Sequence, residues 1–157
     1  ESTFVPARMN LATLLSRRGR YREAEKLLRE AIRYQPTWGQ AYYSLGLLQA
    51  EDKTRLAEAT RNLEKAAAYD GGNPRIFHNL AIAYWQQDKV DPAVASFLRA
   101  IELVPENPEY LQNLVQLLMQ KGRWTDALTH AKQMSKLLPN NPQVASLISQ
   151  IESNLKP

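Results

Sequence analysis

The chain has 157 residues, 44% of them hydrophobic and 23% charged, a composition that favours a folded globular chain over a disordered one. It contains no cysteine, which excludes disulfides, thiolate catalysis and cysteine-ligated metal sites within this segment. No apolar run is long enough to span a membrane, and the formal net charge is +4.

The first helical pair is expected over residues 5–38, after a short frayed lead-in at residues 1–4. Pro6 suits the first turn of a helix, and Gly19 can end that helix in a left-handed turn. The second helix is predicted from Tyr21 to Tyr34, with three residues at helical spacing facing inward: Ala24, Leu28 and Ala31.

The second pair, residues 39–73, is one residue longer, and we place the extra residue between its helices, within Glu51–Arg55. Gly46 stands where Ala12 and Ala81 stand in neighbouring pairs, at the point where paired helices are expected to touch most closely. The Gly71-Gly72 step is interpreted as a turn that requires a positive φ, although a hinge remains the alternative.

The third pair, residues 74–107, shows the pattern most clearly. Its first helix has an apolar face of Phe77, Leu80, Ala81 and Tyr84. Asp91 is predicted to cap its second helix, with Pro92 in the first turn. That helix has an apolar face of Ala93, Phe97, Ala100 and Ile101, and Pro105 ends it.

The fourth pair, residues 108–141, keeps the pattern through Leu114 and Ala127. A last helix is predicted at about residues 142–155, as an amphipathic lid whose apolar stripe is Val144, Leu147, Ile148, Ile151 and Leu155. Trp124 and Tyr21 occupy the same place at the start of a second helix, and both are expected in the core.

Matching positions recur along the whole chain. Leu80 and Leu114 are 34 residues apart, and so are Ala93 and Ala127. Leu11 and Leu45 extend the first series, and Ala24 and Ala59 the second. This period and pattern resemble the tetratricopeptide repeat (TPR) family over nearly the whole chain.

The resemblance implies an all-α fold: a single domain over residues 1–157, built as a right-handed superhelical solenoid of four TPR hairpins plus a C-terminal capping helix. It also implies that the first helix of each hairpin lines a concave groove. More loosely, the phrases FVPARMNLATLL, AYYSLGLLQAE and NPRIFHNLAIAYWQQ resemble the TPR segments of some bacterial multihaem c-type cytochromes, although no haem-attachment CxxCH is present. We therefore expect the C-terminal part of a larger protein.

Residues with the chemistry of an active site do not come together in this sequence. The two histidines, His78 and His130, fall in different helices of different repeats, without a metal-binding spacing. There is no phosphate-binding glycine-rich loop. We expect no catalysis, no cofactor and no metal site, because function is argued from a site and none is evident.

Three asparagines precede the repeated leucine: Asn10, Asn79 and Asn113, with Ser44 at the fourth place. An amide offers a donor and an acceptor together, so a row of amides can pair with an extended peptide backbone. The row resembles the asparagine ladder of TPR regions in O-linked glycosyltransferases. The alternative stays open, since many consensus-like TPR hairpins carry asparagine there.

Around that row, the groove is expected to present an apolar, aromatic and amide-rich surface formed by Met9, Tyr43, Leu47, His78, Ile82, Trp85, Gln112, Gln116 and Met119. Trp85 lies off the core stripe, and exposed tryptophan is enriched at binding hot spots. Packing of Trp85 against Tyr43 or His78 is the alternative. The carboxylate clamp of chaperone-tail binders is not matched, because Arg75 is the one basic residue at the corresponding places.

The first pair also holds most of the basic excess, as the cluster Arg17, Arg18, Arg20, Arg22, Lys26, Arg29 and Arg33. This cluster is either a surface for phosphates or another domain, or a solvated face paired with nearby glutamates; the second interpretation is favoured. Nucleic acid is therefore not the expected partner, because stacking aromatics do not accompany the cluster.

Together these observations predict a non-catalytic protein–protein interaction scaffold that holds an extended peptide or partner domain in its groove. Two alternatives remain open. The chain is then either a unit that assembles head to tail into oligomers or filaments, or an accessory domain of a larger bacterial enzyme or multihaem cytochrome. The sequence leaves bacterial cytoplasm and periplasm equally open, and it predicts no insertion into a membrane.

Overall fold

Helices form pairs along the entire computed structural model, which describes residues 4–156. The four hairpins are α1 (Val5–Arg17) with α2 (Tyr21–Tyr34), α3 (Gly39–Ala50) with α4 (Leu56–Tyr69), α5 (Pro74–Gln86) with α6 (Val90–Leu103), and α7 (Pro108–Gln120) with α8 (Trp124–Leu137). The helix α9 (Pro142–Leu155) packs on α8. The predicted all-α solenoid is confirmed, and no strand occurs within residues 4–156.

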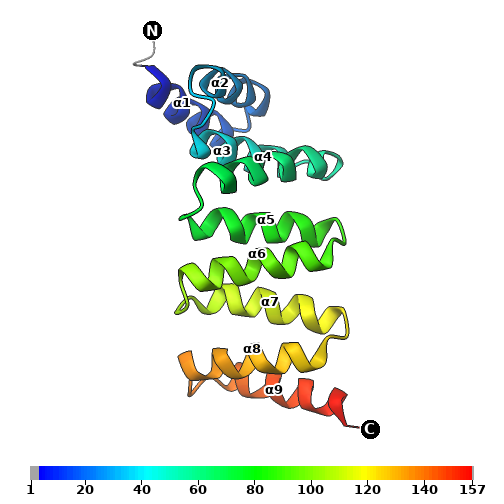
Figure 1. Ribbon diagram of the computed structural model, residues 1–157. Helices are drawn as coiled ribbons and strands as arrows, with labels where there is room; N and C mark the ends of the chain where they lie inside the picture. Colours follow the sequence, from blue (N-terminus) through cyan, green and yellow to red (C-terminus); the bar gives the residue numbers. More distant parts are fainter. Residues whose placement is uncertain (1–3, 157) are drawn as a thin grey trace.

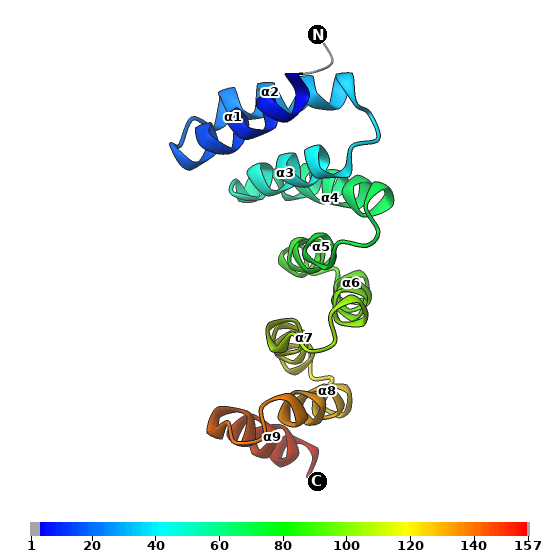
Figure 2. The same ribbon diagram turned by 90° about the vertical axis from the view of Figure 1, so that its left-hand side faces the viewer.

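The hairpins are stacked in one row, with the two ends of the chain at opposite ends of the row (Figure 1). Figure 2 shows that the row bends and that α5 and α7 lie on its inner side, with α6 and α8 on its outer side. The helices α1 and α2 lie across this view, whereas α5, α6 and α7 are seen nearly end-on, so the row also twists.

The turns inside the hairpins depend on left-handed backbone at three equivalent places. Gly19 has φ +74° and Gly122 has φ +70°, as expected where a first helix ends. Asp88 holds the same place with φ +60°. In the second hairpin, the extra residue is absorbed by the short 3₁₀ helix η2 (Lys53–Arg55), as predicted.

The connections between hairpins use asparagine caps. The side-chain oxygens of Asn73, Asn107 and Asn141 accept hydrogen bonds from backbone N–H groups two residues later, at 3.1, 3.0 and 2.9 Å. Neither Gly71 nor Gly72 has a positive φ, so the prediction for that turn was wrong. An Asn73 cap followed by Pro74 starts α5 without a left-handed residue.

A second expected cap was also wrong. The helix α6 begins at Val90, one residue before Asp91, and no side chain caps it. Asp91 lies in its first turn, and one of its carboxylate oxygens is 3.3 Å from Nη1 of Arg123 on the next hairpin. The aspartate therefore links two hairpins.

Core packing follows the predicted stripes except at Leu11 and at Leu155, which was expected in the apolar stripe of the last helix but is 41% exposed. Ala24, Leu28 and Ala31 are buried, and so are Leu80 and Leu114. Leu11, their counterpart on α1, is 47% exposed because no helix before α1 lies within residues 4–156 to cover this face. Tyr21 is 49% exposed, so its predicted place in the core was wrong, whereas Trp124 is partly buried.

Within residues 4–156, no helix has the length and apolar content needed to cross a lipid bilayer.

Candidate binding surface

The inner side of the row is formed by α1, α3, α5 and α7, where the structure places the predicted groove residues. Some of them are exposed: Asn10, Gln112 and Gln116. Others are partly exposed: Ser44, Leu47, Asn79, Ile82, Trp85, Asn113 and Met119. This side therefore offers amides and apolar groups that a ligand could reach.

Three predicted groove residues lie beneath this surface instead. Met9, Tyr43 and His78 are only 7%, 6% and 9% exposed, so the expectation that they face a ligand was wrong. Their side chains turn toward the neighbouring hairpin. The ring of His78, for example, lies 4.8 Å from that of Tyr110. They are part of the joints between repeats.

The asparagine row connects to these joints. Nδ2 of Asn79 donates to the hydroxyl of Tyr43 at 3.0 Å and to the carbonyl of Arg75 at 2.8 Å. Nδ2 of Asn113 lies 2.8 Å from Nε2 of His78 on the preceding hairpin. Within residues 4–156, neither amide oxygen accepts a hydrogen bond from another side chain, so each remains an acceptor for a ligand.

His78 acts as the acceptor in its pair. Burial lowers the pKa of its imidazole and so favours the neutral ring, and the opposite effect of the Glu109 charge is smaller. With Nε2 accepting from Asn113, the proton sits on Nδ1.

Trp85 joins α5 to both neighbouring helices. Its ring meets Phe97 of α6 edge-on at 6.3 Å, and its Nε1 donates to Oε1 of Gln120 on α7 at 2.8 Å. Packing against Tyr43 or His78 was the sequence-based alternative, and the partner is Phe97 instead. The exposed edge of Trp85 helps to line a shallow hollow between α5 and α7.

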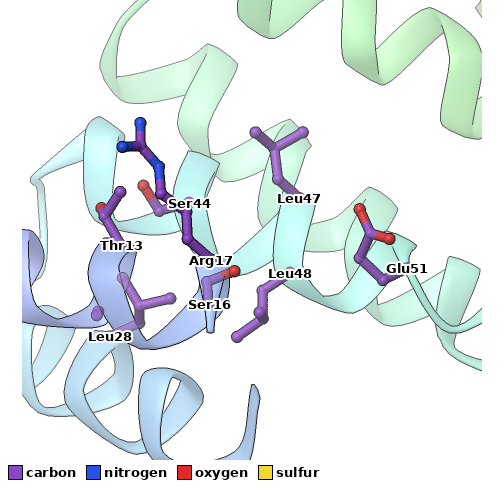
Figure 3. A pocket seen from close by; sticks show the side chains of 9 residues that line it. Thr13, Ser16, Arg17, Leu28, Ser44, Leu47, Leu48 and Glu51 are labelled. Atoms are coloured by element: carbon purple, nitrogen blue, oxygen red, sulfur yellow. The ribbon is translucent and has the colours of Figure 1, made fainter. Parts of the chain in front are cut away.

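A second hollow, with a volume of about 300 Å³, lies between α1 and α3. Its floor is apolar, formed by Ala12, Leu28, Leu47 and Leu48. Hydroxyl groups and two charged side chains surround it: Thr13, Ser16, Ser44, Arg17 and Glu51. Figure 3 shows Arg17 and Glu51 on opposite sides of this hollow.

Sequence reasoning missed most of this hollow. Arg17 was assigned to the basic cluster and Leu47 and Ser44 to the groove, but Thr13, Ser16, Leu48 and Glu51 were not singled out. The available signal was Ser16, a small residue at the place that Trp85 fills two repeats later.

The basic cluster is partly paired within the first hairpin. Arg20 binds Glu23 at 2.6 Å, and Arg29 binds Glu25 at 2.7 Å. These pairs agree with the favoured interpretation of a solvated, self-paired face for those two arginines. No group of three or more His, Asp or Glu side chains within residues 4–156 is arranged to hold a metal ion.

A polar seam fixes the first two hairpins relative to each other and so shapes the hollow. Nη2 and Nη1 of Arg55 donate to the carboxylate of Glu25 at 2.7 and 3.0 Å, and Nη2 also donates to Glu58 at 2.9 Å. Gln49, 1% exposed, donates to Glu58 at 3.2 Å and accepts from Asn62 at 2.7 Å. Hydrogen bonds from Arg55 lower the pKa of Glu25 from 4.5 to about 2.

We expect Glu25→Gln to lower the free energy of unfolding by about 1–2 kcal/mol at neutral pH, since it removes charge-assisted hydrogen bonds that solvent partly screens. Because the carboxyl group has the lower pKa in the folded state, the unfolded chain binds its proton first as the pH falls. The difference between wild type and variant should therefore be complete above pH 4.5 and shrink between pH 4.5 and about 2.

Urea unfolding at a series of pH values measures this difference. Glu152→Gln, an exposed carboxylate on α9, is the control and should show almost no difference at any pH. A Glu25→Gln difference that stays constant from pH 7 to pH 3 would show that the seam does not depend on the charge.

Two family models match the chain. One is described as YpiA-like, C-terminal tetratricopeptide repeats, and matches residues 74–142; the other is described as tetratricopeptide repeat and matches residues 7–34. A human relative, protein O-mannosyl-transferase TMTC3, is 33% identical over 118 residues, which cover 73% of this chain but only 13% of that protein. The chain thus spans a small part of the length of this relative.

Solved structures share the fold. MamA aligns with a TM-score of 0.86 at 15% identity, covering 98% of this chain and 84% of that chain. YrrB, described as a TPR protein with an unusual peptide-binding site, has a TM-score of 0.79 at 21% identity over 93% of this chain and 75% of its own. PilF of Pseudomonas aeruginosa has a TM-score of 0.74 at 25% identity, over 94% and 67%.

Proposed function

Because this chain belongs to the tetratricopeptide-repeat family, we propose that it is a non-catalytic interaction module that binds an extended peptide along the inner side of its row of hairpins. One observation carries the proposal: accessible amides and apolar groups alternate with two hollows along this side. The amide oxygens of Asn79 and Asn113 supply acceptors for backbone N–H groups of the peptide.

The description of YrrB as a TPR protein with an unusual peptide-binding site supports the class of ligand. Within residues 4–156 of this chain, the accessible inner-side residues from Gln112 to Gln120 carry no charge, so backbone contacts and apolar anchors are expected to dominate there. A peptide held in this way is bound mainly through its extended backbone, with selectivity supplied by the hollows.

The test uses a display library of random peptides selected on the wild-type chain. The double variant Gln112→Lys, Gln116→Lys changes two exposed inner-side residues and should weaken the selected peptides at least about tenfold, or about 1.4 kcal/mol. The matched control is Ala95→Lys, Thr129→Lys, which adds the same charge at exposed places on α6 and α8.

Equal loss in both doubles would point to a general effect of charge, and equal affinity in both would place the peptides elsewhere. Either result contradicts the proposal. Circular dichroism of all variants, which change exposed residues only, checks that the fold is retained.

Head-to-tail assembly is the second candidate, supported by the uncovered face of α1. Phe4, Leu11 and Leu14 are 61%, 47% and 45% exposed and share one face of the helix. At the other end of the row, the outward residues of α9 include Ser146 and Gln150, both exposed and polar. A contact between an apolar face and a polar one is weak. Sedimentation at increasing concentration should therefore detect assembly only if the apolar face of α1 contacts another apolar surface.

A further inference from the structure

The hollow between α1 and α3 and the one between α5 and α7 occupy equivalent places, two repeats apart. Ser16 corresponds to Trp85, Arg17 to Gln86, and Glu51 to Gln120. Each hollow lies between the first helices of two neighbouring hairpins: α1 and α3 in the earlier place, α5 and α7 in the later one. The two places therefore differ only in the side chains that fill them.

In the later place, Trp85 covers the apolar floor: the hollow there is lined by Trp85 but not by Phe97 or Leu117, the counterparts of Leu28 and Leu48. The indole of Trp85 packs edge-on against Phe97, and its N–H reaches across to Oε1 of Gln120 at 2.8 Å. In the earlier place, Ser16 is too short to cross to α3, and a hollow of about 300 Å³ remains. Within residues 4–156, no hydrogen bond or ion pair engages the exposed carboxylate of Glu51, the counterpart of Gln120.

We propose that this hollow between α1 and α3 binds the side chain of a tryptophan in the peptide ligand, which covers the apolar floor in the way that Trp85 covers the equivalent floor. The ring lies on Leu28 and Leu48, and its N–H donates to the carboxylate of Glu51 (Figure 3). This inference rests on the proposed function, and it names the anchor residue of the peptide.

The chemistry of the lining favours an indole over other side chains. Aromatic rings gain most from burial on an apolar floor, and the tryptophan N–H needs an acceptor when it is buried. A carboxylate is a stronger acceptor than the Gln120 amide. Arg17, on the opposite side, can lie over the ring face, and it disfavours a basic side chain, while Glu51 disfavours an acidic one. The volume is at the lower end of the range for ligand pockets.

The probe is N-acetyl-L-tryptophan amide, titrated into the isotope-labelled chain and followed by amide chemical shifts. A single side chain should bind with a dissociation constant on the order of millimolar, and shifts should concentrate in α1 and α3. N-acetyl-L-leucine amide is the matched control and should bind at least several-fold more weakly, because it has no N–H in its side chain.

Two variants test the assignment. Ser16→Trp supplies the indole from within, so shifts in α1 and α3 on adding the probe should disappear. Glu51→Ala changes an exposed residue without threatening the fold, and should weaken the probe about tenfold by removing its acceptor. The inference is overturned if the leucine compound binds equally, if Ser16→Trp still shows the shifts, or if Glu51→Ala binds as wild type does.

The two proposals fail in different ways. If display-selected peptides are lost on Gln112→Lys, Gln116→Lys but lack tryptophan, and the probe does not shift α1 and α3, the inner-side function stands and the tryptophan anchor is wrong. If the probe binds as described but the affinity of the selected peptides does not change in Gln112→Lys, Gln116→Lys, the hollow binds a tryptophan side chain and the proposed binding of an extended peptide along the inner side is wrong.

Discussion

Phe97→Ala should lower the free energy of unfolding by about 3–5 kcal/mol, because it removes a fully buried ring that packs between α6 and α5 inside the third hairpin. Phe97 packs against Trp85 of the candidate surface and against His78 beneath it: its ring centroid lies 6.3 Å from that of Trp85 and 5.8 Å from that of His78. Loss of this ring should therefore also loosen the hollow between α5 and α7.

The control for this prediction is the next residue, Leu98, which is 41% exposed on the same helix. Leu98→Ala should change the free energy of unfolding by less than about 1 kcal/mol in urea titrations. If the two variants are equally stable, α5 and α6 of the third hairpin are not packed around Phe97 as described.

Gly46→Val should destabilise the chain by about 1–3 kcal/mol through overpacking between α3 and α4. A Cβ at this place would lie 2.8 Å from Cγ of Leu63 and 3.1 Å from the backbone carbonyl of Ala59. Leu63 is itself 1% exposed and cannot move aside without disturbing the core, and the backbone carbonyl can move even less.

Gly72→Ala is the matched control, since a Cβ at that place has no heavy atom within 4 Å and its φ is not positive. We expect it to be neutral or slightly stabilising, because alanine restricts the unfolded chain more than glycine does. Thermal unfolding of the two variants separates them. A Gly46→Val variant as stable as wild type would mean that α3 and α4 are farther apart than described.

The hairpins could be predicted from the sequence because the same pattern of apolar residues recurs in each repeat. The spacing of Leu80 and Leu114 and of Ala93 and Ala127 fixes which faces meet, and Gly19 marks a turn by its left-handed backbone. Such a periodic pattern can be recognised within one repeat, without knowing which element packs against each helix face.

The predictions of burial were wrong where the exposure of a side chain depends on the neighbouring hairpin. Leu11 has the same place in its repeat as Leu80, yet it is 47% exposed because the described residues 4–156 include no earlier hairpin to cover it. Tyr43 and His78 lie on the helices that line the inner side, but they turn into the joints between hairpins, where Asn79 and Asn113 meet them. A one-dimensional pattern cannot distinguish a groove position from a joint position one step away.

The hollow between α1 and α3 was missed for a related reason. Its apolar floor is open because Ser16 is small where Trp85 is large, and the difference has meaning only once the structure shows that the two places are equivalent. Comparing each position with its counterpart in every repeat would have drawn attention to it.

Paramagnetic broadening by a spin-labelled, display-selected peptide tests most directly where ligands bind. If peptides bind along the inner side, amide signals of α1, α3, α5 and α7 should broaden, including the side-chain amides of Gln112 and Gln116, while those of α4, α6 and α8 stay sharp. Broadening confined to those outer helices, or to the uncovered face of α1 at Leu11 and Leu14, would contradict this prediction.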